Sequence, residues 1–297
     1  MTTLTLTKHH GLGNDFLVLL DAPSADSAVD LAALARRLCD RRRGLGADGL
    51  LIASPADASL GDRSDGRAVR MTLFNADGSR AEMSGNGIRC FAQAIAAERG
   101  DLGDLLVHTD AGDRTVTMTA TDAPDTIVAK VDMGEVVRIE EPAGWPTLGC
   151  HPDRPVMHLS LGNPHSVVGV DEVGVVDLLA LGGKVPQVNL EIVEPGPEAT
   201  AITMRVHERG AGITEACGTG ACAAAFAARS WGLVAGGSAE VTVHMDGGTA
   251  TVGFDAAVAS RVSLTGPATL VATIQVDLTG EVDLTGQVDL IGEVELA

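Results

Sequence analysis

Apolar residues recur at helical spacing in three stretches of the chain. Residues 30–43 (DLAALARRLCDRRR) repeat leucine and alanine at intervals of three and four behind Asp30, a possible helix cap. Two alanine-rich stretches, at about 85–98 and 218–231, each follow a glycine-rich turn. Because alanine-rich helices are often buried, we expect these two to lie inside the protein.

Much of the remaining chain consists of short β-branched runs separated by Gly, Asp and Pro. The run GLGADGLLIA, directly after residues 30–43, predicts a turn and a strand. Further strands are predicted at LLVHTD, RTVTMTA, TIVAKVDMG, VMHLSLG, AEVTVHM and ATVGFD. Together with the helices, these runs predict an α+β protein made of two halves.

Short sequences in the first half reappear in the second. The tripeptide LGN occurs at residues 12–14 and again at 161–163, and SGNG at 84–87 resembles CGTG at 217–220. The two offsets, 149 and 133 residues, are similar. A duplicated unit facing its copy would form one cleft bounded by two equivalent loops, and a ligand would bind there.

We expect the chain to divide into two halves and a tail. The N-terminal half comprises residues 1–122 and is joined by a C-terminal strand near 268–276. The C-terminal half comprises residues 123–267. The tail, 276–297, repeats the hexapeptides VDLTGE, VDLTGQ and VDLIGE and ends in VELA. It could add edge strands or stay unpaired, and we expect no chemistry there.

The charge of the chain indicates the kind of partner. A formal net charge of −19 disfavours nucleic acid and anionic membrane surfaces, because both would be repelled. The partner is therefore expected to be a small molecule. No apolar run approaches the roughly 20 residues that span a bilayer, and the N-terminus lacks the apolar core of a signal peptide. We therefore expect a cytoplasmic protein.

The cysteines and lysines bear on cofactors. The chain has an odd number of cysteines without CxxC pairs, which suggests neither a disulfide framework nor a zinc knuckle. Free thiols are expected at Cys39, Cys90, Cys150, Cys217 and Cys222. None of the lysines lies in an obvious Schiff-base context, so pyridoxal phosphate has few places to attach. We expect neither a metal nor an organic cofactor.

Each glycine-rich turn places a small nucleophilic residue, Ser84 or Cys217, just before a helix. The first backbone N–H groups of a helix lack internal partners and attract anions, so they could bind a substrate carboxylate. The same helix end is expected to lower the pKa of Cys217. Removing an α-hydrogen needs donors aligned on the developing charge in a dry site, which two helix starts could supply. Alternatively, CGTGAC is only a tight turn with a buried thiol.

Other polar residues near these turns have two interpretations each. Glu208 and Arg209 could form a buried pair that binds a substrate's ammonium and carboxylate groups, or a solvated surface pair. His165 could assist a thiol or serve as a structural donor. Turn formation alone could explain the asparagines in the same regions, which are Asn14, Asn75, Asn163 and Asn189.

Taken together, the motifs HGLGNDF, FNADGSRAEMSGNGIRC, GNPH, PQVN and ERGAGITEACGTGAC closely resemble, in order, those of diaminopimelate epimerases. The resemblance covers roughly residues 8–275. It implies two pseudo-symmetric α/β domains, each with a central helix wrapped by twisted, mostly antiparallel sheet, and an active site in the cleft between them. It also implies pyridoxal-independent interconversion of LL- and meso-diaminopimelate in lysine and cell-wall precursor synthesis, in which one cysteine takes the α-proton and another returns one.

The resemblance also assigns roles to individual residues. Its catalytic positions are Cys217, Ser84, His165 and Glu208. Its substrate-binding positions are Asn14, Asn75, Gly85, Asn86, Asn163, Asn189, Glu208, Arg209, Gly218 and Thr219.

Ser84 departs from the family pattern, because a second catalytic cysteine belongs at this position. A serine hydroxyl is far less acidic than a thiol, whose pKa is about 8.5, so Ser84 would be a poor base for an α-hydrogen. It could relay a proton through water or bind the carboxylate. Cys90 does not replace it, since six residues along a helix correspond to about 240° and roughly 9 Å. The serine is compatible with a natural or an engineered substitution.

Three functions follow from these residues. The first is a diaminopimelate epimerase. The second is one-sided α-proton removal by Cys217 followed by β-elimination, as in a hydroxy amino acid dehydratase. The third is a catalytically disabled protein that binds amino acids. A homodimer is the default symmetric expectation.

Overall fold

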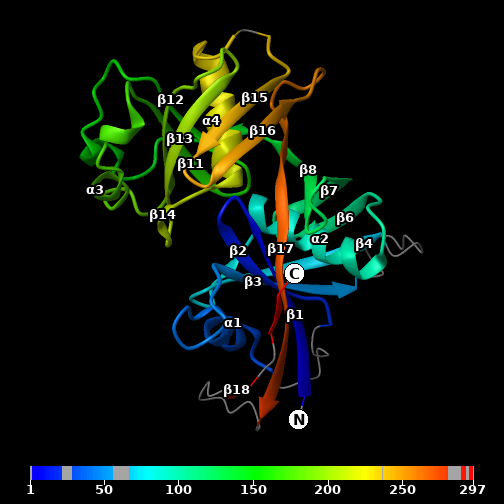
Figure 1. Cartoon of the computed structure of the whole chain (residues 1–297). Helices are drawn as coiled ribbons and strands as arrows, with labels where there is room; N and C mark the ends of the chain where they lie inside the picture. The colour runs from blue at the N-terminus through cyan, green and yellow to red at the C-terminus, as the bar shows by residue number, and fades with distance from the viewer. Residues whose placement is uncertain are drawn as a thin grey trace. The chain divides into compact units, whose positions relative to one another are not determined.

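A computed structural model of the chain describes residues 2–21, 29–55, 67–235, 237–279, 289–291 and 294–296. The chain forms two compact units (Figure 1), unit 1 with residues 1–129 and 267–297 and unit 2 with residues 130–266. The division falls within two long strands, β8 (Thr126–Glu135) and β17 (Arg261–Thr279). The sequence analysis places the division after residue 122.

Unit 1 is built on a mixed sheet. Antiparallel pairing joins β1 to β2, β3 to β4 and β6 to β7, and parallel pairing joins β2 to β3 and β4 to β6. The strands are β1 (Thr2–Gly11), β2 (Asn14–Leu19), β3 (Gly49–Pro55), β4 (Ala68–Asn75), β5 (Arg80–Ala81), β6 (Leu105–Thr109) and β7 (Gly112–Ala120). β1 also pairs antiparallel with β17, which belongs to the C-terminal part of the chain.

Unit 2 repeats this topology strand for strand. Antiparallel pairing joins β10 to β11, β12 to β13 and β15 to β16, and parallel pairing joins β11 to β12 and β13 to β15. The strands are β9 (Val137–Arg138), β10 (Val156–Ser160), β11 (Pro164–Gly169), β12 (Asn189–Pro195), β13 (Ala201–Glu208), β14 (Gly212–Thr214), β15 (Glu240–Met245) and β16 (Gly248–Phe254). The repeated LGN and Gly-rich sequences therefore accompany a repeated fold.

Each unit encloses one long alanine-rich helix, α2 (Gly85–Arg99) in unit 1 and α4 (Gly218–Trp231) in unit 2. Almost every residue in the first three turns of both helices is buried, because α4 packs against six strands of its unit and α2 against β1, β2 and β7. Small alanine side chains let the strands approach from all sides. Both helices end at a left-handed glycine, Gly100 (φ 72°) or Gly232 (φ 75°). The prediction of two buried helices is confirmed.

The helix predicted at 30–43 is shorter than expected. α1 spans Leu31–Cys39, and the Asp30 carboxylate caps it by accepting from the backbone N–H groups of Ala32 and Ala33 at 3.0 and 3.1 Å. It ends because the Asp40 carboxylate accepts from the N–H groups of Arg42 and Arg43, which forms a local turn in place of another helical turn. α3 (Leu178–Gly182) and the 3-10 turns Trp145–Leu148 and Val173–Val175 are too short to show helical periodicity in the sequence.

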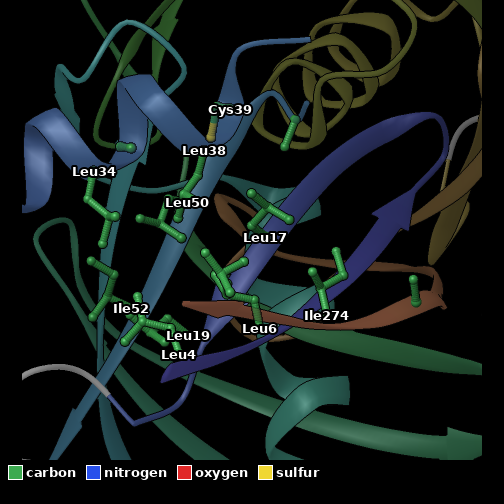
Figure 2. Packing of buried hydrophobic residues seen from close by; sticks show 14 residues of the cluster. Leu4, Leu6, Leu17, Leu19, Leu34, Leu38, Cys39, Leu50, Ile52 and Ile274 are labelled. Carbon is green, nitrogen blue, oxygen red and sulfur yellow. The ribbon is translucent and has the colours of Figure 1, made fainter. Parts of the chain in front are cut away.

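The apolar face of α1 closes one core of unit 1. Figure 2 shows its leucines facing alternate residues of β1, β2 and β3, with Ile274 supplied by β17. The period of two along each strand places these side chains on one face of the sheet. The cluster includes Leu4, Leu6, Leu17, Leu19, Leu34, Leu38, Cys39, Leu50, Ile52 and Ile274.

Part of the C-terminal repeat adds edge strands. β18 (Asp289–Ile291) and β19 (Val294–Leu296) pair antiparallel with β17. The rest of the repeat after residue 279 lies outside the described residues. Among the described residues, no helix combines the length and the apolar character needed to cross a bilayer.

Acidification is expected to destabilise the fold through His9. This histidine is fully buried on β1, its Nδ1 lies 2.9 Å from Gln93 Oε1, and its Nε2 has no hydrogen-bond partner among the described residues. Burial lowers the pKa of His9 to about 4. The unfolded chain therefore binds more protons than the folded chain between about pH 6.5 and 4, so stability is lost as the pH falls through this window.

The expected loss is about 2 kcal/mol between pH 7 and pH 5, from ~1.4 kcal/mol per pKa unit. Urea unfolding at both pH values measures it. His9→Gln removes the titrating ring and should flatten this part of the dependence. An equal pH dependence in parent and variant would show that His9 does not carry the effect.

Candidate active site

Cys217 caps the N-terminus of α4 in unit 2. Its backbone is extended (φ −127°, ψ 114°), and its Sγ accepts from the backbone N–H of Gly220 at 3.4 Å. Thr219 Oγ1 lies 3.6 Å from the same sulfur. Ser, Thr, Asp and Asn are the preferred residues at a helix N-cap, so a thiol here points to chemistry rather than capping. Gly218 is the first residue of the helix and is buried.

Gly220 lets a buried carboxyl group approach the same helix start. A Cβ atom at this position would lie 2.7 Å from Glu191 Oε1 and 3.2 Å from Cys217 Sγ. A side chain at residue 220 would therefore displace one or both groups. The Glu191 carboxyl group and the Cys217 thiol therefore both lie close to the Cα atom of Gly220.

Ser84 takes the equivalent position in unit 1. It caps α2 from an extended backbone (φ −134°, ψ 126°), and its Oγ accepts from the N–H of Gly87 at 3.0 Å. Gly85 follows it as the first, buried residue of the helix. The two glycine-rich sequences thus form the same cap, with a hydroxyl in one unit and a thiol in the other.

Asn14 and Asn86 meet beside the start of α2. Asn14 follows the tight turn between β1 and β2, where Gly13 has a φ of 83°. Asn86 Nδ2 donates to Asn14 Oδ1 at 3.2 Å, and Asn14 Nδ2 donates to Asp48 Oδ2 at 2.6 Å. The buried Arg89 guanidinium donates to Asn86 Oδ1 at 2.9 Å. Both amides are therefore held in fixed orientations.

Asn75 lies at the exposed end of β4, opposite Gly49 in the sheet register. Its Nδ2 donates to Ser79 Oγ at 3.0 Å, within the turn that leads to β5. The next residue, Ala76, donates its N–H to the carbonyl of Asp48 at 3.0 Å. Asp48 thus connects the Asn75 turn to Asn14.

A second group of polar residues meets beside the start of α4. Asn163 follows Gly162, whose φ is 97°, and its Nδ2 donates to Thr219 Oγ1 at 3.2 Å. His165 Nε2 lies 3.0 Å from Asn163 Oδ1, and the ring is fully buried. Asn163 and Thr219 repeat the contact that Asn14 and Asn86 make in unit 1.

Glu191 on β12 is a site residue that the sequence analysis missed. It is fully buried, and its Oε1 lies 2.6 Å from His165 Nδ1. Burial raises the pKa of the Glu191 carboxyl, and the nearby His165 opposes this shift. A signal was present in the sequence, because Glu191 stands between the apolar residues Leu190 and Ile192.

The structure contradicts a buried Glu208–Arg209 pair. Glu208 ends β13 half-buried and accepts a hydrogen bond from Thr214 Oγ1 at 2.5 Å, whereas Arg209 is exposed in the following turn. The chain reverses after β13, so the two side chains lie in different environments. The backbone N–H of Arg209 donates to Oδ1 of the buried Asn189 at 2.8 Å, which places Asn189 beside this turn.

The two capped helix starts occur in a chain that matches a known family of enzymes. A family model described as diaminopimelate epimerase matches residues 6–139 and 157–271. The chain belongs to the diaminopimelate epimerase family. The sequence-based predictions of the family, of its two-unit α+β fold and of an isomerase are confirmed.

Individual members of the family match over nearly their whole length. The diaminopimelate epimerase of Desulfitobacterium hafniense is 38% identical over 293 residues, covering 90% of this chain and 96% of the relative. That of Halothermothrix orenii is 36% identical over 290 residues, with coverages of 91% and 96%. In structure, a predicted epimerase from Pseudomonas aeruginosa superposes with a TM-score of 0.69 at 18% identity, covering 93% of this chain and 99% of that one.

The pKa of the Cys217 thiol is shifted in the direction opposite to the one predicted from the sequence. The pKa of the Cys217 thiol is raised well above its usual value, first by burial and then by the charges of Glu208 and Glu191. The hydrogen bonds from Thr219 and Gly220 lower it but do not compensate. The expectation that the helix end lowers the pKa of Cys217 is therefore not met, because desolvation raises the pKa by more than the hydrogen bonds lower it.

The other thiols of the chain do not cap the start of a long helix. None of the cysteines, Cys39, Cys90, Cys150, Cys217 and Cys222, forms a disulfide. Cys90 is buried within α2, and burial raises its pKa to about 12, so it does not substitute for a catalytic thiol at Ser84. Within the part of the chain that the structure describes, no three His, Cys, Asp or Glu side chains are grouped to bind a metal ion.

Proposed function

We propose that this chain epimerises LL-diaminopimelate to meso-diaminopimelate in lysine and cell-wall precursor biosynthesis, by removing and returning an α-proton without pyridoxal phosphate. The observation that carries the proposal is the start of α4. There a buried thiol, Cys217, caps the helix, accepts from the N–H of Gly220 and lies 3.6 Å from Thr219 Oγ1. Such a site offers an anion-binding end for the carboxylate and a proton carrier beside it.

The chemistry follows from the charges around Cys217. Because the pKa of the Cys217 thiol is raised, the thiol keeps its proton at neutral pH and can donate it. An incoming substrate brings an ammonium group, which would offset the charge of Glu208 and lower the pKa of the thiol. Negative charge developing on the substrate carboxylate would be stabilised by the N–H groups of the helix start. Cys217 would then exchange a proton with the α-carbon in either direction.

We assign the remaining residues by the same logic. Asn14, Asn86, Asn163 and Asn189 present amides for the polar ends of the substrate, with Asn75, Arg209 and the backbones of Gly85 and Gly218 as further contacts. His165 supports the acid–base chemistry through Asn163 and Thr219. Ser84 caps the second helix start, where it binds a carboxylate or relays a proton.

Solvent exchange of the α-hydrogen tests the proposal. Both LL- and meso-diaminopimelate are incubated with the protein in deuterated water and followed by NMR. Exchange at the α-carbon, with Cys217→Ser reducing it strongly, supports the proposed reaction. Release of a keto product from a β-hydroxy amino acid, offered in a parallel incubation, would instead support β-elimination. Binding of diaminopimelate without exchange would support a disabled amino-acid-binding protein.

We further propose that the chain acts as a homodimer in the cytoplasm and does not bind nucleic acid. The net charge of −19 and the cysteines, which form no disulfide, support this environment. Sedimentation equilibrium at micromolar concentration tests the dimer.

A further inference from the structure

A continuous chain of hydrogen bonds connects a buried carboxyl group to Cys217 within unit 2. It starts at Glu191 Oε1, which lies 2.6 Å from His165 Nδ1, and continues from His165 Nε2 to Asn163 Oδ1 at 3.0 Å. Asn163 Nδ2 then donates to Thr219 Oγ1 at 3.2 Å, and Thr219 Oγ1 lies 3.6 Å from Cys217 Sγ. Residues from β11, β12, the turn before β11 and the start of α4 thus form one chain.

The direction of donation along this chain decides what Cys217 receives. Because Asn163 Oδ1 accepts from His165, its Nδ2 faces Thr219, and the Thr219 oxygen accepts. The Thr219 hydroxyl hydrogen then remains available for Cys217 Sγ. If the amide were reversed, the hydroxyl would donate to Asn163 instead, and the sulfur would lose this donor.

Glu191 determines the direction in which hydrogen bonds are donated from His165 through Asn163 to Thr219. Its carboxyl group lies against Nδ1 of His165, and Nε2 faces an amide oxygen that can only accept. Nε2 carries the hydrogen that this contact needs when the two groups form an ion pair or when the carboxyl group donates its proton to the neutral ring. The second oxygen, Oε2, is buried without a hydrogen-bond partner among the described residues, which favours the neutral pair. Without a partner at Nδ1, the ring could move its hydrogen to that nitrogen and leave Nε2 bare.

The corresponding positions of unit 1 show that the fold does not require this pair. Asn14 and Asn163 follow equivalent turns, so Phe16 corresponds to His165, and both pair in parallel register with the first residue of the next strand. Two residues further along those strands, Leu51 corresponds to Glu191. Phe16 and Leu51 are buried, so apolar side chains satisfy the same architecture. A buried acid–base pair that the fold does not need indicates a role at the site.

We propose that Glu191 is a positioning residue for Cys217. Acting through His165 and Asn163, it orients the Thr219 hydroxyl as a donor, so that the sulfur accepts two hydrogen bonds, one from Thr219 and one from the backbone of Gly220. Two donors stabilise the thiolate that must form during α-proton removal. The inference rests on the proposed function only in taking Cys217 as the reactive thiol.

Alkylation of Cys217 tests this role without substrate turnover. The rate of reaction with iodoacetamide is measured from pH 6 to 10 and assigned to Cys217 by mass spectrometry, in Glu191→Gln and Glu191→Leu. Both variants remove the carboxylate, but only glutamine can still donate to His165 Nδ1. Leucine is the residue that unit 1 carries at the equivalent position. Glu208, whose charge acts on the sulfur from β13, and His165 on β11 are present in both variants.

The leucine variant is expected to react with its pH profile shifted upward by about one unit relative to the glutamine variant, or roughly tenfold more slowly below the pKa. Glu194→Gln, on the same strand, should match the parent. Coincident profiles for the glutamine and leucine variants, or a downward shift with leucine, would overturn the proposal. Thr219→Val against Thr219→Ser provides a second pair should the leucine variant fail to fold, and only valine should show the upward shift.

Discussion

Replacing Ser84 by cysteine is expected to raise the rate of interconversion of LL- and meso-diaminopimelate by roughly two to four orders of magnitude, the usual contribution of a positioned acid or base. Inversion at the α-carbon needs a second group that exchanges a proton, and Ser84 occupies in unit 1 the capping position that Cys217 occupies in unit 2. The pKa of a thiol lies several units below that of a serine hydroxyl, so a thiol exchanges protons at neutral pH far more readily. The cap itself should survive, since cysteine already caps α4.

The measurement is the NMR time course from each pure isomer, which separates α-hydrogen exchange from inversion. Ser230→Cys, in the exposed last turn of α4, adds a thiol elsewhere and controls for nonspecific effects. If the parent exchanges one isomer without inverting it, and the variant inverts both, a thiol at position 84 supplies the second proton-exchanging group of the mechanism. A parent that already inverts as fast as the variant would contradict this prediction and show that the serine suffices.

Replacing Cys217 by serine is expected to reduce α-hydrogen exchange by roughly two to four orders of magnitude in the parent and in the Ser84→Cys background. Serine preserves the cap at Gly220, so the helix start and its anion-binding N–H groups should persist. The loss would therefore reflect the acidity of the group rather than a local change of structure.

Cys150→Ser is the matched control for this second prediction. Cys150 is half-buried just after the 3-10 turn Trp145–Leu148 and packs against the apolar cluster that contains Trp145 and Leu148. Thermal unfolding of both variants should remain close to that of the parent. Exchange that persists in Cys217→Ser would contradict the assignment of this thiol as the proton carrier.

The positions of the functional turns could be predicted from the sequence. Glycine is needed where the backbone has a positive φ or where another group lies close to the Cα atom. Because this need depends on a few neighbouring residues, the LGN and Gly-rich sequences indicate turns. The internal repeat of these turns then indicates a duplicated fold, and both units share one strand order. Ser84 and Cys217 were predicted as the residues before the two buried helices, because capping is also a local property.

The electrostatics of the site could not be predicted in the same way. The expected lowering of the Cys217 pKa rested on the helix end, a local effect, whereas burial and the carboxylates of Glu191 and Glu208 act from other strands. The sequence left open whether Glu208 and Arg209 form a buried or a solvated pair, and only the structure shows that Glu208 is half-buried and Arg209 exposed. Sequence proximity does not reveal how far each charge is removed from water.

The sequence by itself determined the family, the two buried helices, the capped turns and the candidate thiol. These depend on spacing and on the conformations of a few residues at a time. Only the tertiary structure decided that Glu191, distant in sequence from Cys217, faces the same helix start through Gly220 and continues through His165 to the thiol. The physical reason is that burial and hydrogen-bond direction are set by neighbouring strands, which the order of residues along the chain does not specify.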